Sequence, residues 1–93
     1  MNAKLTWKDP TTPMTGVELA MRVVGAPGFT KIANVPKGTQ TLDVPDLVDG
    51  AYEFRAVVEN GVAPNIKRSP GIIVAATIVT TPGDVTTFAA SIT

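Results

Sequence analysis

The chain has 93 residues, of which 44% are hydrophobic and 17% are charged. This length suits a single domain, and the apolar share is typical of a folded protein rather than a disordered one. Eight basic and eight acidic residues cancel to a formal net charge of zero, which argues against binding to nucleic acid or to anionic membranes through bulk charge. The same neutrality leaves little charge repulsion between copies of the chain.

The missing residue types restrict the chemistry that the chain can perform. Cysteine and histidine are absent, which removes disulfides, thiolate nucleophiles, the commonest general base and the commonest metal ligand. No apolar run approaches the roughly 18 residues that a membrane-spanning helix needs, and no apolar stretch follows the first residues as in a secretory leader. We therefore expect no enzyme, no cofactor and no membrane insertion, and either a protein that works without export or one that has lost its leader.

Two clusters of charged residues suggest sites at first sight. Asp43, Asp46 and Asp49 recur at intervals of three, but a calcium loop of the EF-hand kind needs alternating ligands and a distal acid. In an extended segment, positions three apart face opposite sides, so we interpret these acids as solvated turn residues and expect no metal site. Lys67 and Arg68 form an adjacent basic pair in a polar loop, where solvation is the simpler interpretation.

Alternation of apolar and polar residues in the first half of the chain predicts short strands. The segments are residues 4–8, 17–23, 29–35 and 39–47, separated by turns that contain proline and glycine. Phe29 is expected to point inward from the third segment, together with Ile32 or Val35. The expected inward residues of the other segments are Leu5, Trp7, Val17, Leu19, Met21, Val23, Leu42 and Val44.

The second half carries the strongest alternation. Residues 51–59 place Tyr52, Phe54, Ala56 and Val58 on one face, residues 60–70 form a polar loop, and residues 71–79 are a β-branched run. Residues 84–92 can form one more strand. About seven strands separated by regular turn signals predict an all-β sandwich.

The order and spacing of three segments resemble the fibronectin type III family. Residues 5–10 are similar to its second strand, residues 16–19 to its third, and residues 47–57 to the corner that leads into its sixth, and the resemblance covers about residues 4–79. It implies a fibronectin type III or immunoglobulin-like β-sandwich in which the Tyr52 hydroxyl bonds the preceding loop. The expected core is Trp7, Leu19, Met21, Leu42, Leu47, Tyr52, Phe54 and Ala56.

The chain departs from the family at its beginning. The family starts with an additional strand for which there is no room before Leu5, whereas residues 82–91 resemble that missing strand. The sequence therefore reads as a domain whose first strand has moved to the C-terminus. We expect a sandwich core over residues 1–79, followed by a linker and a C-terminal strand over residues 80–93.

The displaced strand has two main interpretations. An internal return to its own slot falls short by about 13 Å, because residues 71–79 climb about 30 Å and residues 79–84 reach at most about 17 Å. The tail can pair with its own preceding strand as a hairpin, or it can fill the vacant slot of a neighbouring copy. A frayed tail, or a piece of a longer tandem protein, remains open. The expected interface between copies is Val85, Thr87, Phe88, Ala90 and Ile92 against Leu5 and Trp7.

These interpretations lead to two functional hypotheses. The first is a structural subunit that assembles with itself, in a bacteriophage virion as a decoration, tail or fibre protein, or in a bacterial surface filament. Its partners would be copies of the chain and other virion or surface proteins. The alternative is a monomeric extracellular binding module that contacts carbohydrate or protein, for which Phe29 is the candidate exposed aromatic residue.

Overall fold

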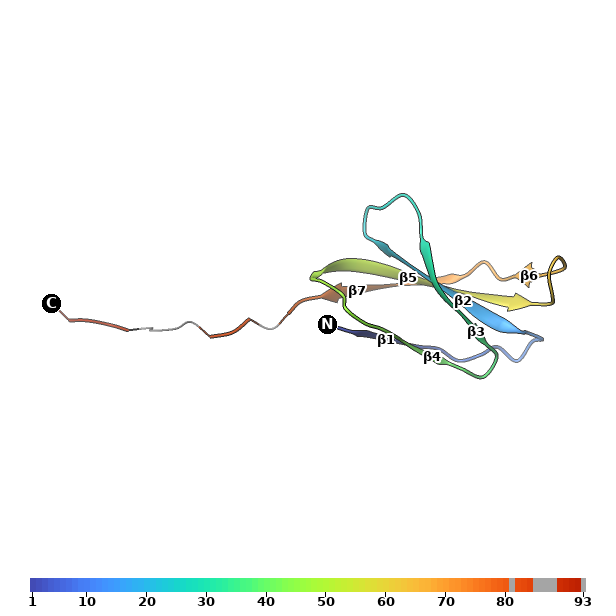
Figure 1. Cartoon of the computed structure of the whole chain (residues 1–93), viewed down its shortest axis with the longest axis horizontal. Helices are drawn as coiled ribbons and strands as arrows, with labels where there is room; N and C mark the ends of the chain where they lie inside the picture. Colours follow the sequence, from blue (N-terminus) through green and yellow to red (C-terminus); the bar gives the residue numbers. More distant parts are fainter. Residues whose placement is uncertain (81, 85–88, 93) are drawn as a thin grey trace.

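The computed structural model describes residues 1–80, 82–84 and 89–92. Across these residues the chain forms seven strands and no helix, and all strand pairs are antiparallel. This confirms the all-β expectation. The strands are β1 (Ala3–Thr6), β2 (Gly16–Val23), β3 (Thr30–Pro36), β4 (Thr41–Val44), β5 (Gly50–Asn60), β6 (Lys67–Arg68) and β7 (Ile72–Ile78) (Figure 1).

The strands form one small and one large sheet. β1 and β4 pair with each other, with Leu5 opposite Leu42. The large sheet has the order β3-β2-β5, and both β6 and β7 pair with β5. The ladder between β2 and β5 runs from Gly16 opposite Glu59 to Val23 opposite Tyr52, so the alternation in these two segments places matching apolar faces side by side.

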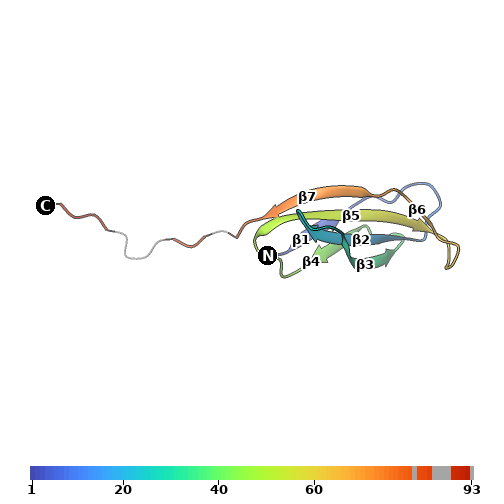
Figure 2. The ribbon, with the colours of Figure 1, turned by 90° about the horizontal axis from the view of Figure 1, so that it is seen from above.

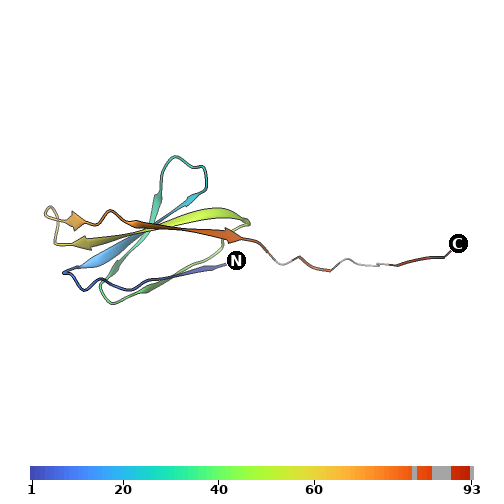
Figure 3. The same cartoon turned by 180° about the vertical axis from the view of Figure 1, so that it is seen from behind.

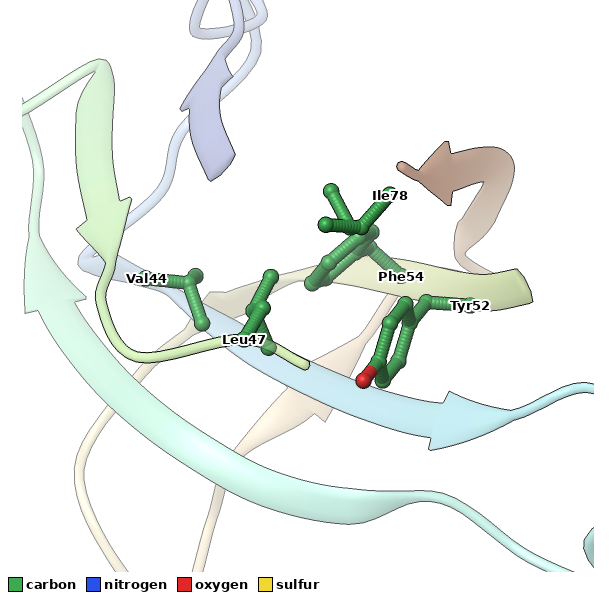
Figure 4. Close-up of a cluster of buried hydrophobic side chains, with 5 residues drawn as sticks. All are labelled: Val44, Leu47, Tyr52, Phe54 and Ile78. Atoms are coloured by element: carbon green, nitrogen blue, oxygen red, sulfur yellow. The ribbon is translucent and has the colours of Figure 1, made fainter. Parts of the chain in front are cut away.

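The core lies between the two sheets and consists of two clusters. One contains Val44, Leu47, Tyr52, Phe54 and Ile78 (Figure 4), and the other contains Met14, Val17 and Leu19. Leu5, Ile32 and Leu42 pack against both clusters. Of the expected core residues, Leu19, Leu47, Tyr52 and Phe54 are buried, whereas Trp7, Met21, Leu42 and Ala56 are half-buried at the margins.

Tyr52 makes the corner contact that the sequence resemblance implies. Its hydroxyl donates a hydrogen bond of 2.8 Å to the carbonyl oxygen of Val48. The side chain is otherwise buried among the residues of the first cluster, so the hydroxyl would lose its partner if the chain before β5 took another path. The bond therefore fixes the approach of the loop to β5.

Two expected inward side chains are placed differently. Phe29 lies on the outer face of the large sheet, where the guanidinium carbons of Arg22 and Arg55 stand 4.4 and 4.7 Å from its ring centroid. Arg55 alternates with the inward-facing Phe54, so a residue stacked against it cannot belong to the core. Val23 is 57% exposed because β2 ends there and turns away. Both expectations were wrong.

The segment expected as a polar loop contains β6. Lys67 and Arg68 pair with Asn60 and Glu59, and the Arg68 guanidinium contacts the carboxylates of Glu18 and Glu59. Between β6 and β7 the chain stays beside β5, where the Ser69 nitrogen donates a hydrogen bond of 2.9 Å to the carbonyl oxygen of Val58. A Cβ atom at position 71 would lie 3.1 Å from a Val57 methyl group, so Gly71 permits this close approach. Val57 is buried as a result, although alternation places it outward.

Candidate functional site

One edge of β1 has no strand beside it. Within the described part of the chain, β1 pairs with β4 and with no other strand. The backbone nitrogen of Trp7 donates to the carbonyl oxygen of Gln40 at 3.2 Å. Because the bonding direction alternates along an antiparallel strand, the backbone groups of Lys4 and Thr6 point away from β4. They present a row of donors and acceptors that another strand can bind.

The position of β1 is fixed by its N-terminal neighbours. The amino group of Met1 donates to the carbonyl oxygen of Leu47 at 3.0 Å, and the Leu47 nitrogen donates to the Met1 carbonyl oxygen at 2.7 Å. The side-chain oxygen of Asn2 accepts a further hydrogen bond from the Asp46 nitrogen. All three bonds lie on the β4 side, so they hold β1 in place without covering its other edge.

Two adjoining hollows lie between the free edge of β1 and β7, and we call them together the edge groove. The larger hollow has a volume of about 520 Å³ and the smaller about 330 Å³. Trp7, Lys8, Ala56 and Ile72 line both. The larger hollow continues toward Pro10, Val58 and Pro70, and the smaller toward Leu5, Leu19, Phe54 and Val74.

The wall that β7 contributes is apolar and uncovered. Ile72 and Val74 pair with Ala56 and Phe54, so they lie on the core face of the large sheet. Nevertheless, Ile72 is 73% exposed and Val74 is 53% exposed, whereas Ile78 at the other end of the strand is 8% exposed. The core is therefore closed at the end of β7 and open at its beginning, where the edge groove lies.

β7 also lacks the features that usually protect an edge strand. Residues 71–79 contain no charged residue and no proline. By contrast β3, at the opposite edge of the same sheet, carries Lys31 and Pro36 and has an irregular register opposite Leu19 and Ala20. Charges, prolines and bulges are the devices by which natural sheets prevent edge pairing. The protected edge is thus β3, and the unprotected edge borders the groove.

The tail leaves the domain at the end that carries the N-terminus. The Asp49 carboxylate accepts hydrogen bonds from the backbone nitrogen and hydroxyl of Thr80, at 2.8 and 2.5 Å. This contact fixes the last residue before the tail. The N-terminus and the arrowhead of β7 lie at one end of the domain in Figures 2 and 3.

The described tail residues, 82–84 and 89–92, are exposed and outside any strand, and in the figures they lie clear of the two sheets (Figure 1). A hairpin with β7 is therefore not seen in this part of the chain. Of the expected interface, Leu5 and Trp7 line the groove, Ala90 and Ile92 are exposed in the tail, and Val85, Thr87 and Phe88 lie outside the described residues.

One wall of the groove was expected from the sequence and the other was not. Leu5 and Trp7 were expected at an interface between copies, whereas Ile72 and Val74 were not, although the uncharged β-branched run at residues 71–79 indicates an apolar edge strand. Among the described residues, no group of three acidic side chains lies close enough together to hold a metal ion. No helix in the same residues is long and apolar enough to cross a membrane.

Comparisons with family models, curated proteins and solved structures gave no match.

Proposed function

We propose that the chain is a non-enzymatic structural subunit with a fibronectin type III-like fold, which assembles when residues 84–92 of one copy occupy the edge groove of the next. The observation that carries this proposal is the coincidence of an open backbone edge on β1 with the bare core-face side chains Ile72 and Val74. A strand added there pairs the backbone and covers the apolar wall in one step.

The composition of the tail suits this groove. Asp84 is the only charged residue in residues 82–93, and Phe88, Ala90 and Ile92 recur every second position. Alternate residues of a strand share a face, so these three side chains can enter an apolar hollow together. The nine residues of the segment extend about 30 Å as a strand, long enough to follow β1 and the chain on either side of it.

The chain geometry favours the groove of a neighbour over the chain's own groove. To pair antiparallel with β1 of its own chain, the tail would have to start beside the end of β1. That point lies at the end of the domain opposite to the one from which the tail leaves. β7 spans about 20 Å between Ile72 and Ile78, and the six steps from Ile78 to Asp84 reach about 20 Å when fully extended. No length is left for the two reversals that such a path requires.

Contacts of this kind are heterologous, because the donor surface differs from the acceptor surface. They generate a ring when the rotation between copies closes and a fibre when it does not. A bacteriophage virion component is the setting that we propose, with a bacterial surface filament as a variant. The alternative of an extracellular binding module gains no support from Phe29, whose ring is covered by the guanidinium groups of Arg22 and Arg55.

Removal of the tail tests the proposal directly. We expect the full chain to form species larger than a monomer, and a chain that ends at Thr81 to be a folded monomer, when both are measured by light scattering. Deletion of Thr93 alone leaves Phe88, Ala90 and Ile92 in place and should preserve assembly. A full chain that remains monomeric at a concentration of hundreds of micromolar would contradict the proposal.

Trp7 offers a second measurement, because it is the only tryptophan and lines both hollows. When a peptide of residues 82–93 is added to the chain that ends at Thr81, we expect the tryptophan emission to move to shorter wavelength and acrylamide quenching to fall. Both changes follow from the exclusion of water around the indole. A peptide with Phe88→Asp serves as the control. Equal effects of the two peptides would show that the groove does not bind the apolar face of the tail.

A further inference from the structure

The two hollows of the edge groove differ in size and position. The larger one, about 520 Å³, adjoins Trp7 and Pro10. The smaller one, about 330 Å³, adjoins Leu5, Phe54 and Val74. The order along β1 is therefore a small hollow near the start of the strand and a large hollow just beyond its end. A segment that fills both should carry a small and a large side chain at matching positions.

We propose that the donated segment runs antiparallel to β1 of the acceptor, with Phe88 beside Trp7, Ala90 beside Leu5 and Ile92 beside Ala3. This inference rests on the proposed function and adds the direction and register of the donated strand. It makes Phe88 the residue that selects the register, because its ring then occupies the larger hollow and Ala90 the smaller one.

The pattern of side chains decides which face of the segment is buried. The even-numbered positions carry Phe88, Ala90 and Ile92, whereas the odd-numbered positions between them and before them carry Thr87, Ala89 and Ser91. The even face holds the two largest apolar side chains of residues 86–92, so its burial removes more apolar surface from water. Ala3, Leu5 and Trp7 are the half-buried, inward residues of the β1 segment, while Lys4 and Thr6 are exposed. Inward residues on paired strands stand opposite one another.

The backbone of β1 favours the antiparallel direction. The peptide groups of Lys4 and Thr6 point to the free edge, and in the proposed register they exchange hydrogen bonds with Ser91 and Ala89. This addition converts a two-stranded sheet, which is marginal by itself, into a three-stranded antiparallel one. Antiparallel pairing is also slightly more stable per residue than parallel pairing.

The direction of the segment sets the symmetry of the assembly. β1 and β7 run in opposite directions across the groove (Figures 1 and 3). A segment antiparallel to the acceptor's β1 therefore runs the same way as the acceptor's β7. If the tail keeps the direction in which it leaves its own β7, successive copies point the same way. This arrangement is a head-to-tail series, whereas a reciprocal pair with exchanged tails would place the segment parallel to β1.

Single-cysteine variants test the register, because the natural chain has no cysteine. Acceptor variants Lys4→Cys and Thr6→Cys are mixed one at a time with donor variants Thr87→Cys, Ala89→Cys and Ser91→Cys, then oxidised. Hydrogen-bonded partners have Cα atoms about 5.5 Å apart, within the range for a disulfide. A shift of two residues along the strand increases the separation to about 8–9 Å, beyond that range.

We expect Lys4→Cys to link to Ser91→Cys and Thr6→Cys to Ala89→Cys, as identified by the masses of the linked peptides, with at least about a tenfold excess over the other combinations. If the acceptor position with the higher number links to the donor position with the higher number, the antiparallel direction is wrong. If both links are displaced by two residues along the donated strand, the direction holds and the register is wrong. Light scattering under reducing conditions checks assembly separately. If the variants assemble but do not form these links, the register is wrong and the proposed function stands. If the variants are monomeric, the proposed function itself is wrong.

Discussion

Moving residues 82–93 from the C-terminus to a position before Met1 is expected to convert the assembling chain into a stable monomer. In the proposed register the donated segment ends beside the start of β1, where Met1 and Asn2 are held by the loop before β5. Thr93, Met1 and Asn2 would then form the connection of a hairpin between the segment and β1, which is a common loop length. The segment would fill the groove of its own chain.

The expected gain in stability is large because the groove is apolar. Burial of the Phe88 and Ile92 side chains contributes about 1.5–3 kcal/mol each, and the walls at Ile72 and Val74 lose exposed surface at the same time. For a domain of this size, 1 kcal/mol corresponds to about 4–8 °C in Tm. Compared with the chain that ends at Thr81, the rearranged chain should therefore melt at least about 12 °C higher.

Thermal unfolding followed by circular dichroism and light scattering gives both readouts. The matched control is the rearranged chain with Phe88→Asp, which keeps the length and connectivity but places a carboxylate at the larger hollow. It should be monomeric with a Tm close to that of the truncated chain. A rearranged chain that still assembles, or that melts no higher than its control, would show that the segment does not belong in the groove.

Most of the strands could be predicted because their faces are settled locally. In β2 the alternation of Val17, Leu19 and Met21 with Glu18, Ala20 and Arg22 is matched residue by residue in the ladder with β5, where Tyr52 and Phe54 alternate with polar residues. The Tyr52 corner was predicted through the resemblance to the fibronectin type III family, and the structure contains the hydrogen bond to the loop before β5.

The errors arose where a long-range contact outweighs the local pattern. Phe29 has the composition of a core residue, but two arginines from β2 and β5 offer it an alternative outside the core. Val57 has an outward position in its strand, yet the close approach of the chain at Gly71 covers it. In both cases the burial of the side chain depends on a contact with another segment of the chain, and the alternation along a single strand carries no information about such contacts.

The candidate site was half predictable for a related reason. Leu5 and Trp7 were selected because a neighbouring strand was missing from the expected pattern. The other wall depends on where the small sheet stops, which leaves Ile72 and Val74 bare and Ile78 covered on the same face of β7. That boundary is a property of how the two sheets overlap, so it is visible only in three dimensions.

The opposite faces of β7 provide the sharpest test of the groove as the acceptor. Ile72 and Ile73 are neighbours of the same residue type, and both are substantially exposed in the isolated subunit, at 73% and 49%. Ile72 lines both hollows, whereas Ile73 pairs with Arg55 on the outer face. Because both side chains already reach water, an aspartate at either position should leave the truncated chain folded.

Assembly should distinguish the two variants by a wide margin. In Ile72→Asp the donated segment would bury a carboxylate in the apolar groove, at a cost of several kcal/mol. About 4 kcal/mol corresponds to a thousandfold weaker association, so this variant should be monomeric where the natural chain assembles. Ile73→Asp places its carboxylate near Arg55 on the solvent side and should assemble within about threefold of the natural chain. Analytical ultracentrifugation over a range of concentrations measures both constants. Equal weakening by the two substitutions would mean that the copies meet along the edge of β7 as a whole, and no difference from the natural chain would remove the groove from the assembly.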